Sequence, residues 1–222
     1  MKIILDLGSG ETCKNETHQV RKMIEAIDKV DNRKHEIILK WQLFREWGEL
    51  IPLHEGIFTY AYLEAEKRGY VCTASVFDTE SAKFLKIFPV PFVKLACVPE
   101  VYNSMPIVLI DFGWWEKPIV LSIPDQDEYR RLANVPEYKY NVKFLCCVRA
   151  YPADVLDYFY TFGDFLPTGI SDHTDHTKGF ELVKKYKPEI YETHFCLDEQ
   201  TGPDTGAFAL RPAQLAELLE VV

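Results

Sequence analysis

Two histidines and two lysines occupy positions where they could carry out chemistry. His173 and His194 each close an apolar, strand-like run, and Lys40 and Lys94 each lie inside one. Paired imidazoles with oxygen donors suit a divalent ion, for which we expect manganese or magnesium, although zinc and iron also accept imidazole. An ammonium group inside an apolar strand is costly unless it is paired. The sequence therefore predicts a metal ion at the histidines and an anionic ligand between the lysines.

Other polar residues fall near the ends of similar runs. Glu192 and His194 are two residues apart, so on a strand they share a face, and the carboxylate lies beside the expected ion as ligand, base or orienting group. Alternatively, Glu192 pairs with a lysine inside the fold. The remaining polar residues at run ends are Asp6, Gln42, Ser75, Asp78, Ser122, Arg149, Tyr151, Ser171 and Asp172.

The elements that must position these residues alternate along the whole chain. We expect strands at Lys2–Gly8, Glu36–Leu43, Tyr70–Phe77, Phe92–Cys97, Pro118–Ile123, Asn141–Val148, Thr168–His173 and Glu189–Cys196. Helical patterns follow them at Thr17–Val30, Phe58–Arg68, Glu80–Phe88, around Val101–Ile110, and at Asp127–Ala133, Val155–Phe162, Lys178–Tyr186 and Pro212–Val222.

Strands that alternate with helices predict right-handed crossovers and a parallel sheet. Eight such units favour a compact (β/α)₈ TIM barrel of the α/β class, formed by residues 1–222 as a single domain without an internal linker. An open doubly wound sheet is the alternative, but the first junction, Gly8–Cys13, lacks the third glycine of a dinucleotide-binding turn. In a barrel the polar residues would meet at the carboxyl ends of the strands.

Composition limits the partners of the protein. Its 222 residues carry a formal net charge of −9 and are 47% hydrophobic, so we expect no nucleic-acid partner and no anionic membrane surface. The apolar run at the N-terminus is too short for a signal peptide or a membrane span, which predicts a cytoplasmic protein.

The six cysteines show no CxxC spacing. Most lie inside apolar runs, so we expect buried free thiols rather than disulfides or a zinc site. Cys146 and Cys147 are adjacent, and their side chains should therefore point to opposite faces of a strand.

Three short motifs give the sequence a family resemblance. Ser171–Thr174 reads Ser-Asp-His-Thr, Glu192–Phe195 reads Glu-Thr-His-Phe, and Gly202–Asp204 reads Gly-Pro-Asp. In this order and spacing they resemble the barrel domain of the sialic acid synthases, or N-acetylneuraminate synthases. Weaker matches are Asp6–Gly8, Lys40–Gln42, Lys94–Cys97, Lys117–Ser122 and Ala150–Pro152.

The resemblance implies an activity and a role for each matched residue. Sialic acid synthases condense phosphoenolpyruvate with an N-acetylmannosamine-type sugar aldehyde, use a divalent metal and release phosphate. Their metal ligands match His173 and His194, and their catalytic or sugar-contacting groups match Glu192, Asp6, Tyr151 and Asp204. Groups that hold phosphoenolpyruvate match Lys40, Lys94, Ser122 and Ser171. A homodimer is also implied, whereas the family's C-terminal antifreeze-like domain has no counterpart in these 222 residues.

The sequence departs from the family at several of these positions. Asp6 replaces a glutamate, Cys97 replaces a phosphate-binding serine, and Pro99 replaces a catalytic glutamate. Arg149 could hold the phosphate through two hydrogen bonds, or fill the site and change its ligand. Two alternatives therefore stay open beside the synthase: a related metal-dependent aldolase or lyase acting on a small anionic keto acid, and a barrel that binds a metabolite without turnover.

Overall fold

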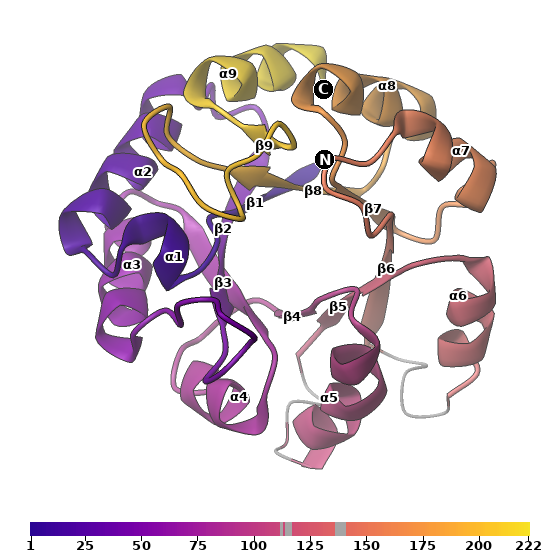
Figure 1. Cartoon of the computed structure of the whole chain (residues 1–222), viewed down its shortest axis with the longest axis horizontal. Coiled ribbons are helices and arrows are strands. Elements are labelled where there is room, and N and C mark those ends of the chain that lie inside the picture. The colour runs from indigo at the N-terminus through magenta and orange to yellow at the C-terminus, as the bar shows by residue number, and fades with distance from the viewer. Residues whose placement is uncertain (112, 114–116, 136–140) are drawn as a thin grey trace.

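The computed structural model describes residues 1–111, 113, 117–135 and 141–222. Eight parallel strands run in the order β1 to β8, and β1 pairs with β8, so the sheet closes into a barrel (Figure 1). The helices lie outside this ring of strands, each one following its strand along the chain. The predicted (β/α)₈ barrel is confirmed, and the closing pair excludes the open sheet.

The observed bounds agree closely with the expected ones. The strands are β1 Lys2–Asp6, β2 Glu36–Leu43, β3 Val71–Val76, β4 Val93–Leu95, β5 Ile119–Ile123, β6 Val142–Cys147, β7 Gly169–Asp172, β8 Ile190–Phe195 and β9 Ala209–Leu210. The helices are α1 Gly10–Cys13, α2 Thr17–Val30, α3 Glu55–Lys67, α4 Thr79–Leu85, α5 Pro99–Asp111, α6 Gln126–Ala133, α7 Val155–Phe162, α8 His176–Tyr186 and α9 Pro212–Val221.

Two elements were not predicted. Helix α1 has four residues, and β9 has two residues that pair with the end of β8. Neither is long enough to show a helical or alternating period in the sequence. Helix α8 also begins earlier than expected, at His176, because the Asp175 side chain caps it by accepting a hydrogen bond from the Thr177 amide.

The interior of the barrel contains an apolar layer. Successive side chains of a strand point to opposite faces, so every second residue enters the barrel. The inward residues at this level form one buried cluster, separate from the larger core between strands and helices. Its members are Ile4, Ile38, Phe92, Val120, Leu145 and Ile190.

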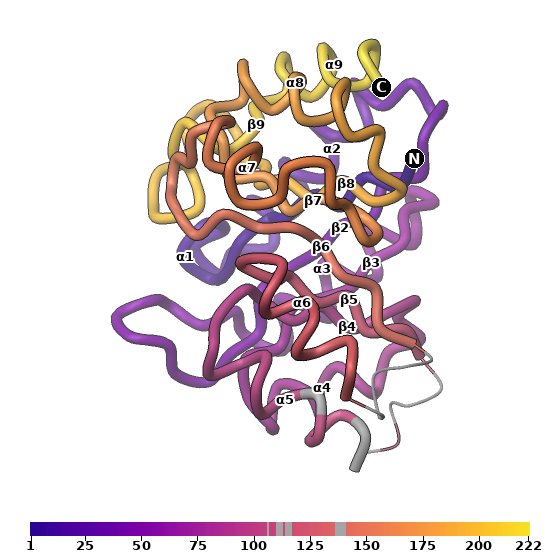
Figure 2. The backbone as a smooth tube through the Cα atoms, turned by 90° about the vertical axis from the view of Figure 1, so that its right-hand side faces the viewer, coloured from indigo at the N-terminus to yellow at the C-terminus, as the bar shows by residue number. Residues whose placement is uncertain are grey.

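The two ends of the barrel differ. Figure 2 shows α1 and β9 at one end, beyond the carboxyl ends of the strands, and both chain termini at the other end.

All six cysteines are buried and free, as predicted. No helix in the described part of the chain is long and apolar enough to cross a membrane.

Close packing of β7 against β8 gives a test of the barrel. A Cβ added at Gly169 would lie 2.0 Å from the Ile190 carbonyl oxygen, a backbone atom that cannot move away without disturbing the sheet. We therefore expect Gly169→Ala to lower the free energy of unfolding by about 1–3 kcal/mol, the usual cost of forcing extra atoms into a packed core. Urea denaturation monitored by circular dichroism measures this change.

Gly56 on α3 provides the matched control, because no atom lies within 4 Å of its added Cβ. Gly56→Ala should leave the stability unchanged or raise it by up to about 1 kcal/mol, since alanine favours helix. Equal effects of the two substitutions would contradict the packing described here.

Candidate active site

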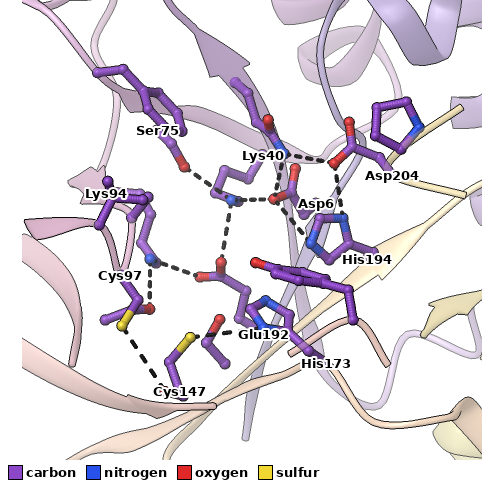
Figure 3. A pocket seen from close by; sticks show the side chains of 18 of the residues that line it. Asp6, Lys40, Ser75, Lys94, Cys97, Cys147, His173, Glu192, His194 and Asp204 are labelled. Atoms are coloured by element: carbon purple, nitrogen blue, oxygen red, sulfur yellow. Dashed lines mark hydrogen bonds and ion pairs between the residues drawn. The ribbon is translucent and has the colours of Figure 1, made fainter. Parts of the chain in front are cut away.

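A cavity of about 440 Å³ opens at the carboxyl ends of the strands. Nearly all the residues predicted to do chemistry line it together (Figure 3). Its lining includes Asp6, Lys40, Lys94, Ser122, Tyr151, Ser171, His173, Glu192, His194 and Asp204. The sequence therefore identified a group of residues that the fold brings to one place.

This cavity exists because polar residues lie two positions beyond the apolar layer. Ile4 is followed by Asp6 on the inner face of β1, and Ile38 is followed by Lys40 on β2. The same step takes β8 from Ile190 to Glu192. A step of two residues along each strand thus changes the side chains inside the barrel from apolar to charged.

The buried charges form a continuous network. Lys40 Nζ donates to Asp6 Oδ2 at 2.6 Å and lies 3.2 Å from Glu192 Oε1. Lys94 Nζ lies 3.7 Å from the other oxygen, Glu192 Oε2. Figure 3 shows the two ammonium groups on either side of this one carboxylate.

This network supplies partners for the two buried lysines. The sequence predicted an anionic ligand at Lys40 and Lys94, which stays a prediction, and carboxylates of the chain also pair with both lysines. The alternative position proposed for Glu192, as an ion-pair partner inside the barrel, is the one observed. Any anion that enters must compete with Glu192 for the lysines.

Lys40 is held firmly in its charged form. Burial alone would lower the pKa of Lys40 and raise that of Asp6. The attraction between the two groups, together with Glu192, overcomes burial and raises the Lys40 pKa above its usual range. The ammonium of Lys40, with His194 and the Gly8 amide, likewise holds the Asp6 pKa well below its usual range.

Lys94 differs from Lys40 although both are buried. Its side chain donates to two neutral oxygens, the Leu95 carbonyl at 2.9 Å and the Ser122 hydroxyl at 2.8 Å. Burial lowers the pKa of Lys94, Glu192 opposes that shift, and the positive charge of Lys40 adds to it. The net direction is downward, so the two lysines have opposite electrostatic environments.

His173 is oriented by the backbone. Its Nδ1 lies 2.9 Å from the Val148 carbonyl oxygen, which selects the tautomer with a proton on Nδ1 and leaves Nε2 with a lone pair. The Tyr151 ring stacks on this imidazole with centroids 4.1 Å apart. Burial lowers the His173 pKa, but Cys147 and the Val148 carbonyl outweigh burial and raise it.

His194 lies between two carboxylates. Its Nε2 is 3.9 Å from Asp6 Oδ2, and its Nδ1 is 3.5 Å from Asp204 Oδ1. Among the described residues Nδ1 has no hydrogen-bond partner, although it is buried. Burial lowers the His194 pKa, although the two acidic neighbours oppose this shift.

The two imidazoles lie close together at the cavity. Their ring centroids are 5.5 Å apart, and both rings line the cavity. Among the described residues, no group of three or more His, Cys, Asp or Glu side chains is arranged to hold an ion. A divalent ion held by His173 and His194 would need water or substrate oxygen atoms as its remaining ligands.

A loop after β8 brings Asp204 to the cavity. Gln42 donates to Asp204 Oδ1 at 3.1 Å and Thr12 donates to Asp204 Oδ2 at 3.3 Å. Gly8 permits this approach: its φ of +75° is unfavourable for other residues, and an added Cβ would lie 2.2 Å from the Thr12 hydroxyl oxygen and 2.7 Å from Asp204 Oδ2.

The departures from the family occupy three different environments. Arg149 is exposed and lies outside the residues that line the cavity, so its expected contact with phosphate stays a prediction. Pro99 is the first residue of α5, where a missing amide proton costs little. Cys97 does line the cavity, with its Sγ 4.0 Å from the Cys147 carbonyl oxygen.

Some lining residues escaped the sequence analysis. Cys147 enters the cavity whereas Cys146 belongs to the core outside the strands, which confirms that their side chains diverge. One wall of the cavity is apolar and includes Trp47 and Phe77, whose ring centroids are 5.0 Å apart. Alternation along β6 was a signal for Cys147, whereas Trp47 lies in a loop without any period.

The fold and this cavity define a barrel protein whose site carries buried cations, carboxylates and two imidazoles at the usual catalytic end. The model of the NeuB family matches residues 13–222. The chain belongs to this family. No sequence among curated proteins matches it.

Solved structures share the fold at low sequence identity. A sialic acid synthetase from Leptospira borgpetersenii serovar Hardjo-bovis has a TM-score of 0.80 and 20% identity, over 99% of this chain and 81% of its own. A spore coat polysaccharide biosynthesis protein from Bacillus subtilis has a TM-score of 0.74 and 16% identity, over 98% and 66%. A truncated 3-deoxy-D-arabino-heptulosonate 7-phosphate synthase from Thermotoga maritima gives 0.68 and 12%, over 99% and 84%.

The shared carboxylate of Glu192 gives a test of the network. Glu192→Gln removes the charge that pairs with Lys94 and partly with Lys40, so it should lower the free energy of unfolding by about 3 kcal/mol, as expected for breaking a buried ion pair. Urea denaturation at pH 7 measures the loss. The control is Glu189→Gln, which removes the exposed pair with Lys143 and should change stability by less than about 1 kcal/mol. Equal losses would show that the Glu192 pairs contribute no more than a surface contact.

Proposed function

We propose that the protein is a sialic acid synthase-like enzyme that condenses phosphoenolpyruvate with a sugar aldehyde, assisted by a divalent metal, and releases phosphate. The observation that carries this proposal is that two buried lysines and two imidazoles line one cavity. Membership of the NeuB family supports the same class of reaction.

The lysine side of the cavity suits phosphoenolpyruvate. Lys40 and Lys94 provide two positive charges, and Ser122 and Ser171 provide hydroxyl groups nearby. Such a group of donors would hold the phosphate and the carboxylate of phosphoenolpyruvate together despite their mutual repulsion. Because Glu192 already pairs with both lysines, its carboxylate must give way in part when the anion binds.

The histidine side suits the aldehyde. A manganese or magnesium ion bound by His173 and His194 would supply positive charge for the aldehyde oxygen. Asp204 and Tyr151 lie around the same imidazoles and would contact the hydroxyl groups of the sugar. Asp6 connects the two sides, since it contacts Lys40 and lies 3.9 Å from His194.

Glu192 would act as the base. After carbon–carbon bond formation, water must add to the cation derived from phosphoenolpyruvate, and a base must accept the proton of that water. Glu192 Oε2 has no hydrogen-bond partner among the described residues and lines the cavity. It can therefore accept a proton there.

Phosphate release tests the reaction. Wild-type protein with phosphoenolpyruvate and manganese should release phosphate only when a suitable aldehyde from a panel that includes N-acetylmannosamine is added. Lys40→Met should lower this rate at least about a hundredfold, because one charge that stabilises the anion is lost. Lys143→Met, at an exposed ion pair, is the control and should retain the wild-type rate.

Product analysis by mass spectrometry separates the alternatives. A new carbon–carbon bond supports the synthase, and cleavage of a keto acid without use of phosphoenolpyruvate would instead establish an aldolase or lyase. Binding of phosphoenolpyruvate with no turnover under any aldehyde would overturn the enzymatic proposal.

Metal binding gives an independent prediction. Calorimetry with manganese should show that His173→Ala and His194→Ala each lose most of the affinity, and that the double variant loses little more, because two ligands of one ion act as a unit. Protons compete with metal for imidazole, so affinity should fall as the pH is lowered. Because the His173 pKa is raised above 6.5, this fall should begin at a higher pH than it would for an ordinary imidazole. Wild-type affinity in both single variants would exclude the site.

A further inference from the structure

The two cavity lysines are not equivalent, and the difference concerns their ability to act as nucleophiles. A lysine attacks carbonyl carbon only as a free amine, so a neighbouring carboxylate that stabilises the ammonium form prevents the attack. Lys40 has such neighbours, with Asp6 at 2.6 Å and Glu192 at 3.2 Å. It is therefore kept as a cation.

Lys94 lies in surroundings that favour a free amine. Its exposed fraction is 1%, its hydrogen bonds go to the Leu95 carbonyl and the Ser122 hydroxyl, and the Glu192 carboxylate lies at 3.7 Å, beyond a hydrogen bond. Lys40 pairs with the other oxygen of the same carboxylate, and its positive charge disfavours the ammonium form of Lys94. Burial and this repulsion lower the pKa of Lys94.

The other titratable groups near Lys94 are the thiols of Cys97 and Cys147 and the carboxylate of Glu192. All three attract an ammonium when they are charged. Cys147 and burial raise the pKa of Cys97, whereas the contacts with Cys97 and His173 lower the pKa of Cys147 despite its burial. The decrease in the Lys94 pKa persists in their presence. Lys94 thus combines access to a cavity with conditions under which lysines become nucleophilic.

We propose that Lys94 forms an imine with small 2-oxo acids, a covalent activity beyond the condensation proposed above. The 2-oxo acid would place its carboxylate at the permanent cation of Lys40 and its carbonyl carbon at Lys94. The two functional groups are on adjacent carbon atoms, and the two ammonium groups share one carboxylate, so the spacing suits a short ligand.

The step balances without any redox partner. The Lys94 nitrogen forms a bond to the carbonyl carbon, the carbon–oxygen bond breaks, and two of the three ammonium protons leave with the oxygen as water. An ammonium and a carbonyl thus become an iminium and water, and the positive charge remains beside Glu192. That carboxylate would stabilise the iminium as it stabilises the ammonium.

Reductive trapping tests this inference. The purified protein is incubated with pyruvate and sodium cyanoborohydride near neutral pH, and the modified lysine is located by peptide mass spectrometry. We expect severalfold more adduct at Lys94 than at Lys40 or at any exposed lysine, because a lowered pKa leaves a larger share of the lysine as free amine. The preference should disappear in protein unfolded by urea, because the free amine depends on the fold.

Variants sharpen the result. Lys94→Met should abolish the preferred adduct, and the exposed Lys143→Met should leave it unchanged. Lys40→Met should reduce it, because removing the neighbouring cation leaves Glu192 to stabilise the Lys94 ammonium alone. Absence of an adduct in the wild type, or the same distribution in folded and unfolded protein, would overturn the inference whether or not the Lys94 variant folds.

The same preparations separate this inference from the proposed function. An adduct at Lys94 without phosphate release under any aldehyde would support the imine and overturn the condensation. Phosphate release without an adduct would overturn the imine alone.

Discussion

The site depends on one shared carboxylate. Glu192 lies between the ammonium groups of Lys40 and Lys94, next to the layer of apolar side chains inside the barrel. Without it, two buried cations would repel each other in surroundings that weaken the solvation of charge. With it, positive charge can be kept at the carboxyl end of the barrel and still be available to an anion. The position of Glu192 on β8 is thus the constraint around which the rest of the cavity is arranged.

From this carboxylate the contacts extend to both sides of the cavity. Lys40 pairs with Asp6, and Asp6 lies close to His194. His194 in turn lies close to Asp204 on the loop after β8. Lys94 leads to Ser122 on β5. The imidazole side and the lysine side are therefore electrostatically connected, and a charge that binds on one side changes the field on the other. Binding of a cation near the histidines and an anion near the lysines should favour one another.

Eight strand-like runs that alternate with helix-like runs were enough to predict the barrel. Because the carboxyl ends of barrel strands meet, the same pattern indicated that Asp6, Lys40 and Glu192 would lie together, and the structure brings them to one cavity. What escaped prediction depends on contacts between residues far apart in the chain. The pairing of Glu192 with the lysines was only one of two alternatives that the sequence left open. Trp47 and Phe77 pack against each other at the cavity, and no local pattern in the sequence predicts this contact. Arg149 follows β6, is exposed and lies outside the residues that line the cavity, so its expected contact with phosphate stays a prediction.

A crystal structure of the protein with manganese and phosphoenolpyruvate would test the central claim most directly. The account predicts an anomalous manganese peak within coordination distance of one nitrogen of His173 and one of His194. It also predicts the phosphate or carboxylate of phosphoenolpyruvate in contact with Lys40 and Lys94, with Glu192 displaced from at least one of them. Manganese bound elsewhere, or an anion held outside this cavity while Glu192 keeps both lysines, would contradict the account.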